Sequence, residues 1–310
     1  MLLPEDETLR DLLSRLDLEP TTSSRHVGDD FFEGTSPPAG NGRIYGGLVF
    51  AQSMRAAQAT VEPERVAHSA HAYFLRPGDP EQPIEYAVDR IRDGGTFTTR
   101  RVVAHQGERA IFNLSMSFQV PEEAPSRQVD VDVPGEPKGE EYEEGILRGS
   151  AALGGQITRE QLGSLPVQIL VEDGLDMTAN GEGGREPELR AWFRAIAPLP
   201  DDPALHQAML AYASDQTIVV AAQHPMPWGI MDPDTQSASL DHAMWFHEDF
   251  RIDDWIYAVH DSPVLKGSRA LGRVLFYTRD GRLVASAVQE GLMRRREGAG
   301  IRLRRRSKLR

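Results

Sequence analysis

Polar and apolar residues alternate along residues 109–120, and a period of two is typical of a strand with one buried face. Every second residue from 110 to 118 is apolar, and the residues between them are polar except Ile111. Gln106, Gly107 and Glu108 separate this segment from residues 97–105. We therefore predict an antiparallel hairpin over residues 97–120.

The same patterns predict the remaining elements. Apolar residues at helical spacing indicate helices over residues 5–16, 46–60 and 203–222. Shorter alternating or apolar runs predict a strand ending near residue 32, strands at 68–76, 84–92, 167–171, 189–196, 237–247 and 255–260, and a second hairpin over 271–278 and 283–293.

Residues 121–165 interrupt this order because they are rich in Pro, Gly and Glu. Such a composition predicts a connecting segment rather than part of a core. We therefore expect an N-terminal unit at residues 1–120, a linker at 121–165, a C-terminal unit at 166–293 and a basic tail at 294–310.

The two units repeat one order of elements, which is helix, strand, strand and hairpin. The tetrapeptide starting at His71 resembles the one starting at His242, an offset of 171 residues. The hairpin turns at Gly107 and Gly281 differ by 174. Nearly equal offsets are typical of a duplicated unit. The sequence thus predicts an α+β fold in which each of two antiparallel sheets is wrapped around a helix.

Charge is distributed unevenly along the chain. Residues 294–310 contain nine Lys and Arg residues and one acidic residue, Glu297, a net charge of +8. The whole chain has a net charge of -13, so residues 1–293 have a net charge of -21. Because phosphate contacts need a basic face, this acidic body argues against nucleic-acid binding. A block of like charges predicts a solvated, disordered tail.

Composition also limits the compartment and the chemistry. No run of 18 apolar residues occurs, and the acidic residues 1–20 do not have the pattern of a signal peptide. Cys is absent, which excludes disulfides, thiolate metal sites and a Cys nucleophile. We expect a cytoplasmic protein without stable membrane insertion.

Five segments of the chain resemble the acyl-CoA thioesterase II family, in the family's order. They read GRIYGGLVFAQSM, VAHSAHAYFLRPGDP, YASDQTI, ASLDHAMWFH and VASAVQEGLMR. The resemblance covers residues 7–294 and is weakest in the linker. It implies a double hotdog fold, acyl-CoA as substrate, hydrolysis without a cofactor and assembly into a homo-oligomer.

The resemblance also implies three catalytic residues. In this family an Asp, a Thr or Ser, and a Gln orient the water that attacks a thioester carbonyl. Their positions correspond to Asp215 in YASDQ, Ser239 before the LDH tripeptide, and Gln289 in VQEG. Many relatives have Thr where this chain has Ser239, so the hydroxyl is kept while a methyl group is lost.

The residues themselves leave two interpretations of Asp215 open. A carboxylate in an apolar helix must accept hydrogen bonds if it is buried, and Ser239 and Gln289 can donate them. Alternatively, Asp215 caps the N-terminus of a helix that begins at Gln216. Gly46 and Gly47, at a predicted helix start, offer backbone N–H donors for an oxyanion and are candidate substrate-binding residues.

The histidines do not have the spacing of a metal site. His242 and His247 would lie on opposite faces of one strand, so no metal is expected there. His242 and its repeat counterpart His71 are expected to be packing or supporting residues near the site, and His68, His71 and His242 are candidate substrate-binding residues. His68 aligns with Ser239 at the same offset of 171, which suggests a decayed site in the first half.

Two other functions remain open. A hydratase or dehydratase acting on acyl thioesters would need an Asp and a His on one helix face, but His206 precedes Asp215 by nine positions and points elsewhere. A non-catalytic acyl-CoA-binding protein is the second alternative. The chain has no G-x-S-x-G motif, which argues against a serine-nucleophile hydrolase.

Overall fold

The computed structural model describes residues 6–23, 25–37, 42–152, 157–158, 165–175, 185–232 and 234–295. Its helices are α1 (Glu7–Leu16), α2 (Gly46–Gln58), α3 (Tyr142–Ala152) and α5 (Pro203–Ser214), with a 3-10 turn η1 (Val220–Gln223). Its strands are β1 (Glu19–Thr21), β2 (Asp30–Gly34), β3 (Val66–Phe74), β4 (Ile84–Asp93), β5 (Phe97–Gln106), β6 (Arg109–Gln119), β7 (Glu140–Glu141), β8 (Val167–Val171), β9 (Glu188–Ala195), β10 (Thr235–Ser239), β11 (Asp241–Phe246), β12 (Ile256–Lys266), β13 (Arg269–Thr278) and β14 (Leu283–Arg295).

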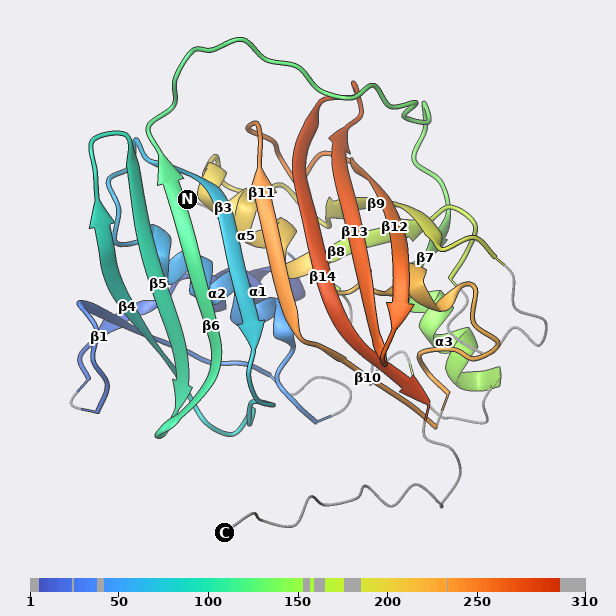
Figure 1. Ribbon diagram of the computed structural model, residues 1–310, viewed down its shortest axis with the longest axis horizontal. Helices are drawn as coiled ribbons and strands as arrows, with labels where there is room; N and C mark the ends of the chain where they lie inside the picture. The colour runs from blue at the N-terminus through green and yellow to red at the C-terminus, as the bar shows by residue number, and fades with distance from the viewer. Residues whose placement is uncertain are drawn as a thin grey trace.

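The described strands form one 14-stranded sheet (Figure 1). Its order is β1-β2-β4-β5-β6-β3-β11-β14-β13-β12-β9-β8-β7, and β10 also pairs with β14. Every pairing is antiparallel, and both predicted hairpins are confirmed as β5–β6 and β13–β14. The α+β, double hotdog architecture predicted for the chain is therefore present.

The two halves of the sheet meet where β3 pairs with β11. His71 lies opposite Ala243, and Ala72 lies opposite His242. The segments that the sequence comparison matched with each other are thus neighbours in space. Because successive side chains of a strand point to opposite faces, His71 and His242 are on opposite faces of the sheet. The 171-residue offset is therefore wrong as a structural alignment, because it equates two histidines that point to opposite faces.

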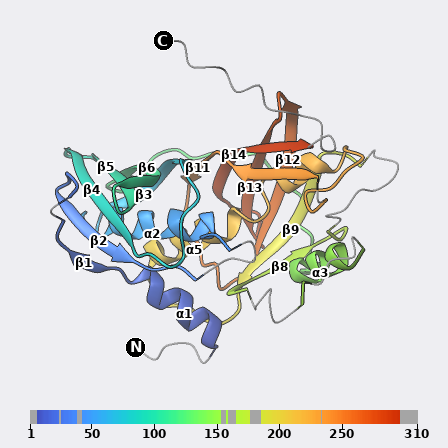
Figure 2. The ribbon, with the colours of Figure 1, turned by 90° about the horizontal axis from the view of Figure 1, so that it is seen from below.

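Helices α2 and α5 pack against each other, and the strands of the first half curve around them (Figure 2). Phe50, Met54 and Met209 on these helices are completely buried. Burial of each such side chain stabilises the fold by roughly 1.5–3 kcal/mol. Helix α5 begins at Pro203, where the Asp202 side chain accepts a hydrogen bond from the Ala204 N–H at 3.0 Å.

The helix predicted over residues 203–222 ends earlier than expected, at Ser214. The next backbone bonds, from Gln216 N to Ala213 O and from Thr217 N to Ser214 O, are each 3.2 Å long and span three residues. This tighter turn is typical of a helix end, and the β-branched residues that follow disfavour continuation. Asp215 is therefore the C-terminal cap of α5. It lies at the end of the helix rather than inside it, and the alternative that it caps the N-terminus of a following helix is wrong.

Part of the predicted linker belongs to the core, contrary to its composition. Residues 140–152 form β7 and α3, and Tyr142 is only 6% exposed. Its hydroxyl donates to the Gln216 carbonyl at 2.9 Å. The Glu and Gly residues around Tyr142 gave this segment the composition of a loop, so its contact with the core was not predicted. The division into units at residues 1–120, 121–165 and 166–293 stays a prediction, and residues 296–310 of the basic tail lie outside the described part of the chain.

None of the helices in the described residues is long and apolar enough to cross a membrane.

Candidate active site

The start of α2 meets the end of α5 at two glycines. A Cβ atom on Gly46 would lie 2.9 Å from Oδ2 of Asp215 and 2.7 Å from the ring of Phe74. A Cβ on Gly47 would lie 2.4 Å from the Tyr212 carbonyl oxygen. Real side chains do not tolerate such contacts, so glycine is what allows the helices to approach this closely. The partial positive end of α2 thus faces the Asp215 carboxylate.

Asp215 accepts hydrogen bonds from both residues predicted to accompany it. Gln289 Nε2 lies 2.6 Å from Asp215 Oδ1, and Ser239 Oγ lies 3.3 Å from the same oxygen. The Asp215 side chain is 5% exposed. A carboxylate buried to this extent needs such donors, because it has lost its water. The structure therefore brings Asp215, Ser239 and Gln289 together in one network.

Ser239 is the last residue of β10, and the register against β14 shifts by one residue between β10 and β11. Leu240, between the two strands, donates its N–H to the Glu290 carbonyl at 2.9 Å and accepts from Phe74 N at 3.0 Å. Asp241 Oδ1 accepts from Glu290 N at 2.6 Å, which fixes β11 against β14. The Asp241 carboxylate thus bonds to the backbone of β14 and has a structural role. The continuous strand predicted for residues 237–247 is interrupted at the residue after Ser239.

His242 supports Gln289 from the buried face of β11. Ser214 Oγ donates to the Ala211 carbonyl at 3.0 Å and lies 3.2 Å from His242 Nε2, so it faces that nitrogen as an acceptor. The imidazole proton is then on Nε2, which leaves Nδ1 to accept from Gln289 Nε2 at 3.4 Å. The His242 ring also packs against Phe50, with ring centroids 4.8 Å apart.

Three tyrosines surround the end of α5, of which Tyr142 is buried while Tyr45 and Tyr212 are partly buried. Burial raises the pKa of Tyr45 and Tyr142 well above their usual range, and the nearby charge of Asp215 raises them further. Burial also raises the pKa of Tyr212 to about 12. The Tyr45 hydroxyl donates to the Tyr212 carbonyl at 2.6 Å. These phenols therefore stay protonated and act as packing and hydrogen-bonding groups at neutral pH.

A cavity of about 330 Å³ opens beside Asp215. Asp215, Ser239 and Gly46 line it, whereas Gln289 and His242 do not. Its other lining residues are mainly apolar or backbone, with two arginines, and include Phe74, Ile111, Phe112, Arg43 and Arg76. The carboxylate and the hydroxyl are therefore the groups of the network that face the cavity, and Gln289 lies behind them.

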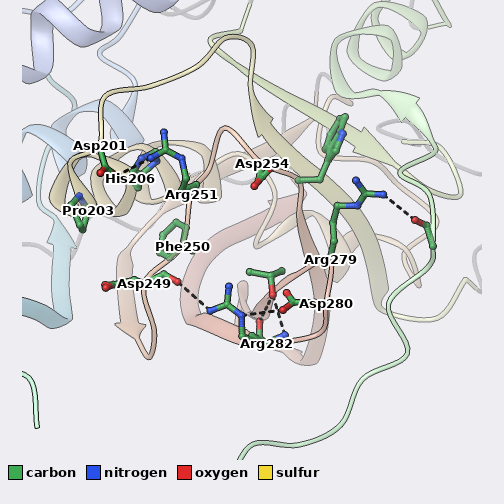
Figure 3. A pocket seen from close by; sticks show the side chains of 13 residues that line it. Asp201, Pro203, His206, Asp249, Phe250, Arg251, Asp254, Arg279, Asp280 and Arg282 are labelled. Atoms are coloured by element: carbon green, nitrogen blue, oxygen red, sulfur yellow. Dashed lines mark hydrogen bonds and ion pairs between the residues drawn. The ribbon is translucent and has the colours of Figure 1, made fainter. Parts of the chain in front are cut away.

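A second cavity, of about 780 Å³, lies beside the other end of α5 and contains none of the predicted catalytic residues (Figure 3). Two of its arginines pair with carboxylates that also line it, Arg251 with Asp201 and Arg282 with Asp280. His206 lines this second cavity, and its Nδ1 accepts from Ile252 N at 3.2 Å. His206 and Asp215 consequently face different cavities, as their spacing predicted.

The other predicted histidines do not reach Asp215. His71 lies on the outer face of the sheet, where its ring packs edge-on against Trp245 at 5.1 Å. His68 Nε2 lies 2.8 Å from Ser117 Oγ. Neither residue lines the 330 Å³ cavity. Of the five residues predicted to bind substrate, Gly46 lines this cavity, while Gly47 and His242 lie directly behind its wall.

Two supporting residues were missed in the sequence. Ser214 directly precedes Asp215 and orients His242, so its position in the YASDQ segment was an available signal. Tyr45 directly precedes Gly46, and its ring packs edge-on against Tyr212 at 5.0 Å. No periodicity marks Tyr45, because it is the capping residue before α2.

Known proteins resemble the chain over nearly its whole length. Residues 35–119 match a family model described as the acyl-CoA thioesterase N-terminal domain, and residues 167–292 match one described as acyl-CoA thioesterase. An acyl-CoA thioesterase 2 from Haemophilus influenzae is 32% identical over 289 residues, which cover 93% of this chain and 98% of the relative.

Solved structures agree with this result. The crystal structure of an acyl-CoA thioesterase II from Mycobacterium marinum is 34% identical with a TM-score of 0.71, and the match covers 93% of this chain and 99% of that one. A protein with a hot dog fold from Alicyclobacillus acidocaldarius, 16% identical, has a TM-score of 0.66 over 92% and 98% of the two chains, and supports the fold alone. This chain belongs to the acyl-CoA thioesterase II family.

Proposed function

We propose that this protein hydrolyses acyl-CoA thioesters to a free fatty acid and coenzyme A, with a water molecule activated by Asp215. The observation that carries the proposal is the carboxylate of Asp215, which lines the cavity while Gln289 and Ser239 donate to its Oδ1. Membership of the acyl-CoA thioesterase II family supports the choice of substrate.

Asp215 acts as the general base in this mechanism. It takes one proton from water while the water oxygen bonds to the thioester carbonyl carbon. The tetrahedral intermediate then collapses, and the bond between carbon and sulfur breaks. A thiol of this type has a pKa near about 8.5, so the leaving thiolate needs no strong acid and is reprotonated by Asp215 or by solvent.

Ser239 and Gln289 have different roles. The Ser239 hydroxyl lines the cavity and donates to Asp215, so its oxygen lone pairs are placed to accept from the attacking water. Gln289 is completely buried behind Asp215 and holds the carboxylate in one orientation. Ser239 is thus a water-contacting residue and Gln289 a positioning residue.

The negative charge that develops on the carbonyl oxygen lies at the start of α2 in this proposal. Gly46 lines the cavity, and Gly46 and Gly47 are the first two residues of the helix. Backbone N–H groups in the first turn have no partner within the helix, and they favour an anion. A single donor of this kind contributes roughly 10²–10³ in rate.

The cavity fits a ligand with an apolar segment and an anionic segment. Phe74, Ile111 and Phe112 form its apolar wall, and Arg43 and Arg76 are its cationic residues. In an otherwise acidic body, these two arginines are the groups that we assign to the phosphates of coenzyme A. Arg76 donates from Nη1 to the Ala110 carbonyl at 2.6 Å, which fixes its guanidinium at the cavity.

The experiment that tests this function is product analysis with purified protein and acyl-CoA. A thioesterase releases free thiol and fatty acid in equal amounts. A hydratase would change the acyl chain without releasing thiol, and a non-catalytic binder would yield saturable binding without product. Absence of thiol release over a series of acyl-chain lengths would contradict the proposal.

A cytoplasmic location and a homo-oligomeric assembly are further proposals for this protein. Cell fractionation and light scattering test them directly.

A further inference from the structure

Two histidines and a glutamate from three separate segments meet at the first half of the sheet, away from Asp215. They are His26 in the segment between β1 and β2, Glu85 in β4 and His105 in β5. One potential ligand atom of each residue lies within 4.8 Å of those of the other two. Strands β6, β3 and β11 separate β5 from β14, which carries Gln289.

The backbone fixes this arrangement. Glu85 and His105 are direct partners in the pairing of β4 with β5, so their side chains leave the same face of the sheet. The segment of His26 turns onto that face, where Ser23 Oγ accepts from His26 N at 3.2 Å and donates to Glu85 Oε1 at 2.9 Å. The cluster is therefore organised by pairing and by a turn, not by chance contact of long side chains.

The two imidazole rings are stacked, with centroids 3.7 Å apart and planes inclined by 12°. Neutral imidazole is the form that binds metal ions, and each ring can offer one in-plane nitrogen lone pair. His26 Nε2 donates to the Gly107 carbonyl at 2.8 Å, and such a bond to a carbonyl commonly orients a metal-binding histidine.

One nitrogen in the cluster lacks an ordinary hydrogen-bond partner. His105 Nδ1 is buried and meets no partner at ordinary hydrogen-bond geometry among the described residues, although the Val103 backbone interacts with the ring. A buried nitrogen without a partner destabilises the fold, so such atoms are rare unless a ligand satisfies them. The carboxylate of Glu85 is 26% exposed, which gives a small ion access from solvent.

We propose that His26, Glu85 and His105 form a binding site for a divalent transition-metal ion, of which zinc is the representative. Two imidazoles and one carboxylate are a ligand set that zinc accepts, with a fourth position for water. Ligand atoms around tetrahedral zinc are about 3.3 Å apart, and a zinc ion lies close to the plane of each imidazole that binds it. The side chains therefore close in, and at least one ring rotates out of the stack, on binding. The ion ties the segment of His26 to β4 and β5 and stabilises this edge of the first half.

The test uses the full chain, freed of metal by a chelator and titrated with zinc chloride in a calorimeter. We expect one zinc ion per chain, with micromolar or tighter affinity. The double variant His26→Asn, His105→Asn should bind none. The matched control His68→Asn, His71→Asn removes two histidines from the same sheet and should still bind one ion.

A second, more conservative variant distinguishes loss of the metal site from misfolding of the double variant. Glu85→Gln keeps the size of the side chain and its acceptor for Ser23 but removes the charge, so zinc affinity should fall at least about 10-fold. At zinc concentrations about 100 times the wild-type Kd, the wild-type Tm should rise by about 4 °C, and that of Glu85→Gln by at most about half as much. Equal stoichiometry in the wild type and the double variant, or no binding to the wild type at micromolar zinc, would overturn the site. Thioester hydrolysis is not part of this readout, so the result is independent of the proposed function.

Discussion

The side-chain nitrogen of Gln289 lies 2.6 Å from Oδ1 of Asp215, although the two residues are 74 positions apart in the sequence. Gln289 comes from β14 and Asp215 from the cap of α5, so the bond connects the sheet to the end of the central helix. Because Gln289 is completely buried within the sheet, it sets the direction of the carboxylate. The catalytic proposal depends on this direction.

Gln289→Ala should therefore impair turnover more than binding. Asp215 would lose its shorter hydrogen bond, and the carboxylate could rotate away from the water. We expect kcat to fall about 10- to 100-fold with little change in KM, and the free energy of unfolding to drop by about 1–3 kcal/mol. Steady-state kinetics and thermal unfolding measure both effects. A raised KM at unchanged kcat would instead assign Gln289 to substrate binding.

Gly46→Ala should lower activity because of its position, not because glycine is flexible. The new Cβ would lie 2.9 Å from Asp215 Oδ2 and 2.7 Å from Phe74. Relief of these contacts displaces the carboxylate or α2 and costs about 1–3 kcal/mol. Gly95→Ala is the matched control, since no atom lies within 4 Å of its added Cβ. Wild-type kcat in Gly46→Ala would show that the close approach is not needed.

Arg76→Ala should discriminate between substrates that differ in their phosphates. We expect KM for acyl-CoA to rise about 10-fold, because one charge-assisted contact is worth roughly 1.5–3 kcal/mol when formed in a cavity. The KM for an acyl-pantetheine without phosphates should not change. Arg101→Ala, an exposed arginine paired with Asp89, serves as control. Equal effects of Arg76→Ala on both substrates would contradict the assignment.

Stability should fall on acidification, partly through His260. Burial lowers the pKa of His260 to about 4, whereas an imidazole in the unfolded chain titrates near about 6.5. The folded pKa is the lower one, so the stabilising contribution of the neutral ring is complete above about pH 6.5 and is lost as the pH falls toward 4, by up to about 3 kcal/mol. Thr217 Oγ1 lies 2.9 Å from Nε2 of this ring.

His260→Gln removes this titration, so its Tm should decrease less between about pH 7 and pH 5 than that of the wild type. The slope against pH is the readout, because the variant also loses hydrogen bonds and starts from a lower Tm. An identical slope in both proteins would assign the acid sensitivity to other groups.

The sequence predicted the hairpins and the central helices well because their patterns are local. The alternation in residues 109–120 arises because one face of this strand is buried. Gly107 and Gly281 have positive φ, which a tight turn requires and glycine permits. The site could be predicted only through a resemblance, since Asp215, Ser239 and Gln289 belong to three elements. Each of these residue types is common, and no spacing marks them as a group.

Other features depended on tertiary structure and could not be read from local patterns. The end of α5 at Ser214 depends on a tight turn, and Tyr142 is anchored by contacts with a segment more than 70 residues away. His26, Glu85 and His105 are far apart in the sequence, so no ligand spacing exists. The match of His71 with His242 was out of register, because a faint repeat does not fix which face a side chain takes.

Asp215→Asn tests whether Asp215 takes the proton from the attacking water. Asn keeps the size of the side chain and can still pair with Ser239, but its amide cannot accept a proton. Thiol release from acyl-CoA should fall by about 10²–10⁴ in kcat while acyl-CoA binding, measured by calorimetry, stays within a few-fold of the wild type. Undiminished thiol release by Asp215→Asn would contradict the account.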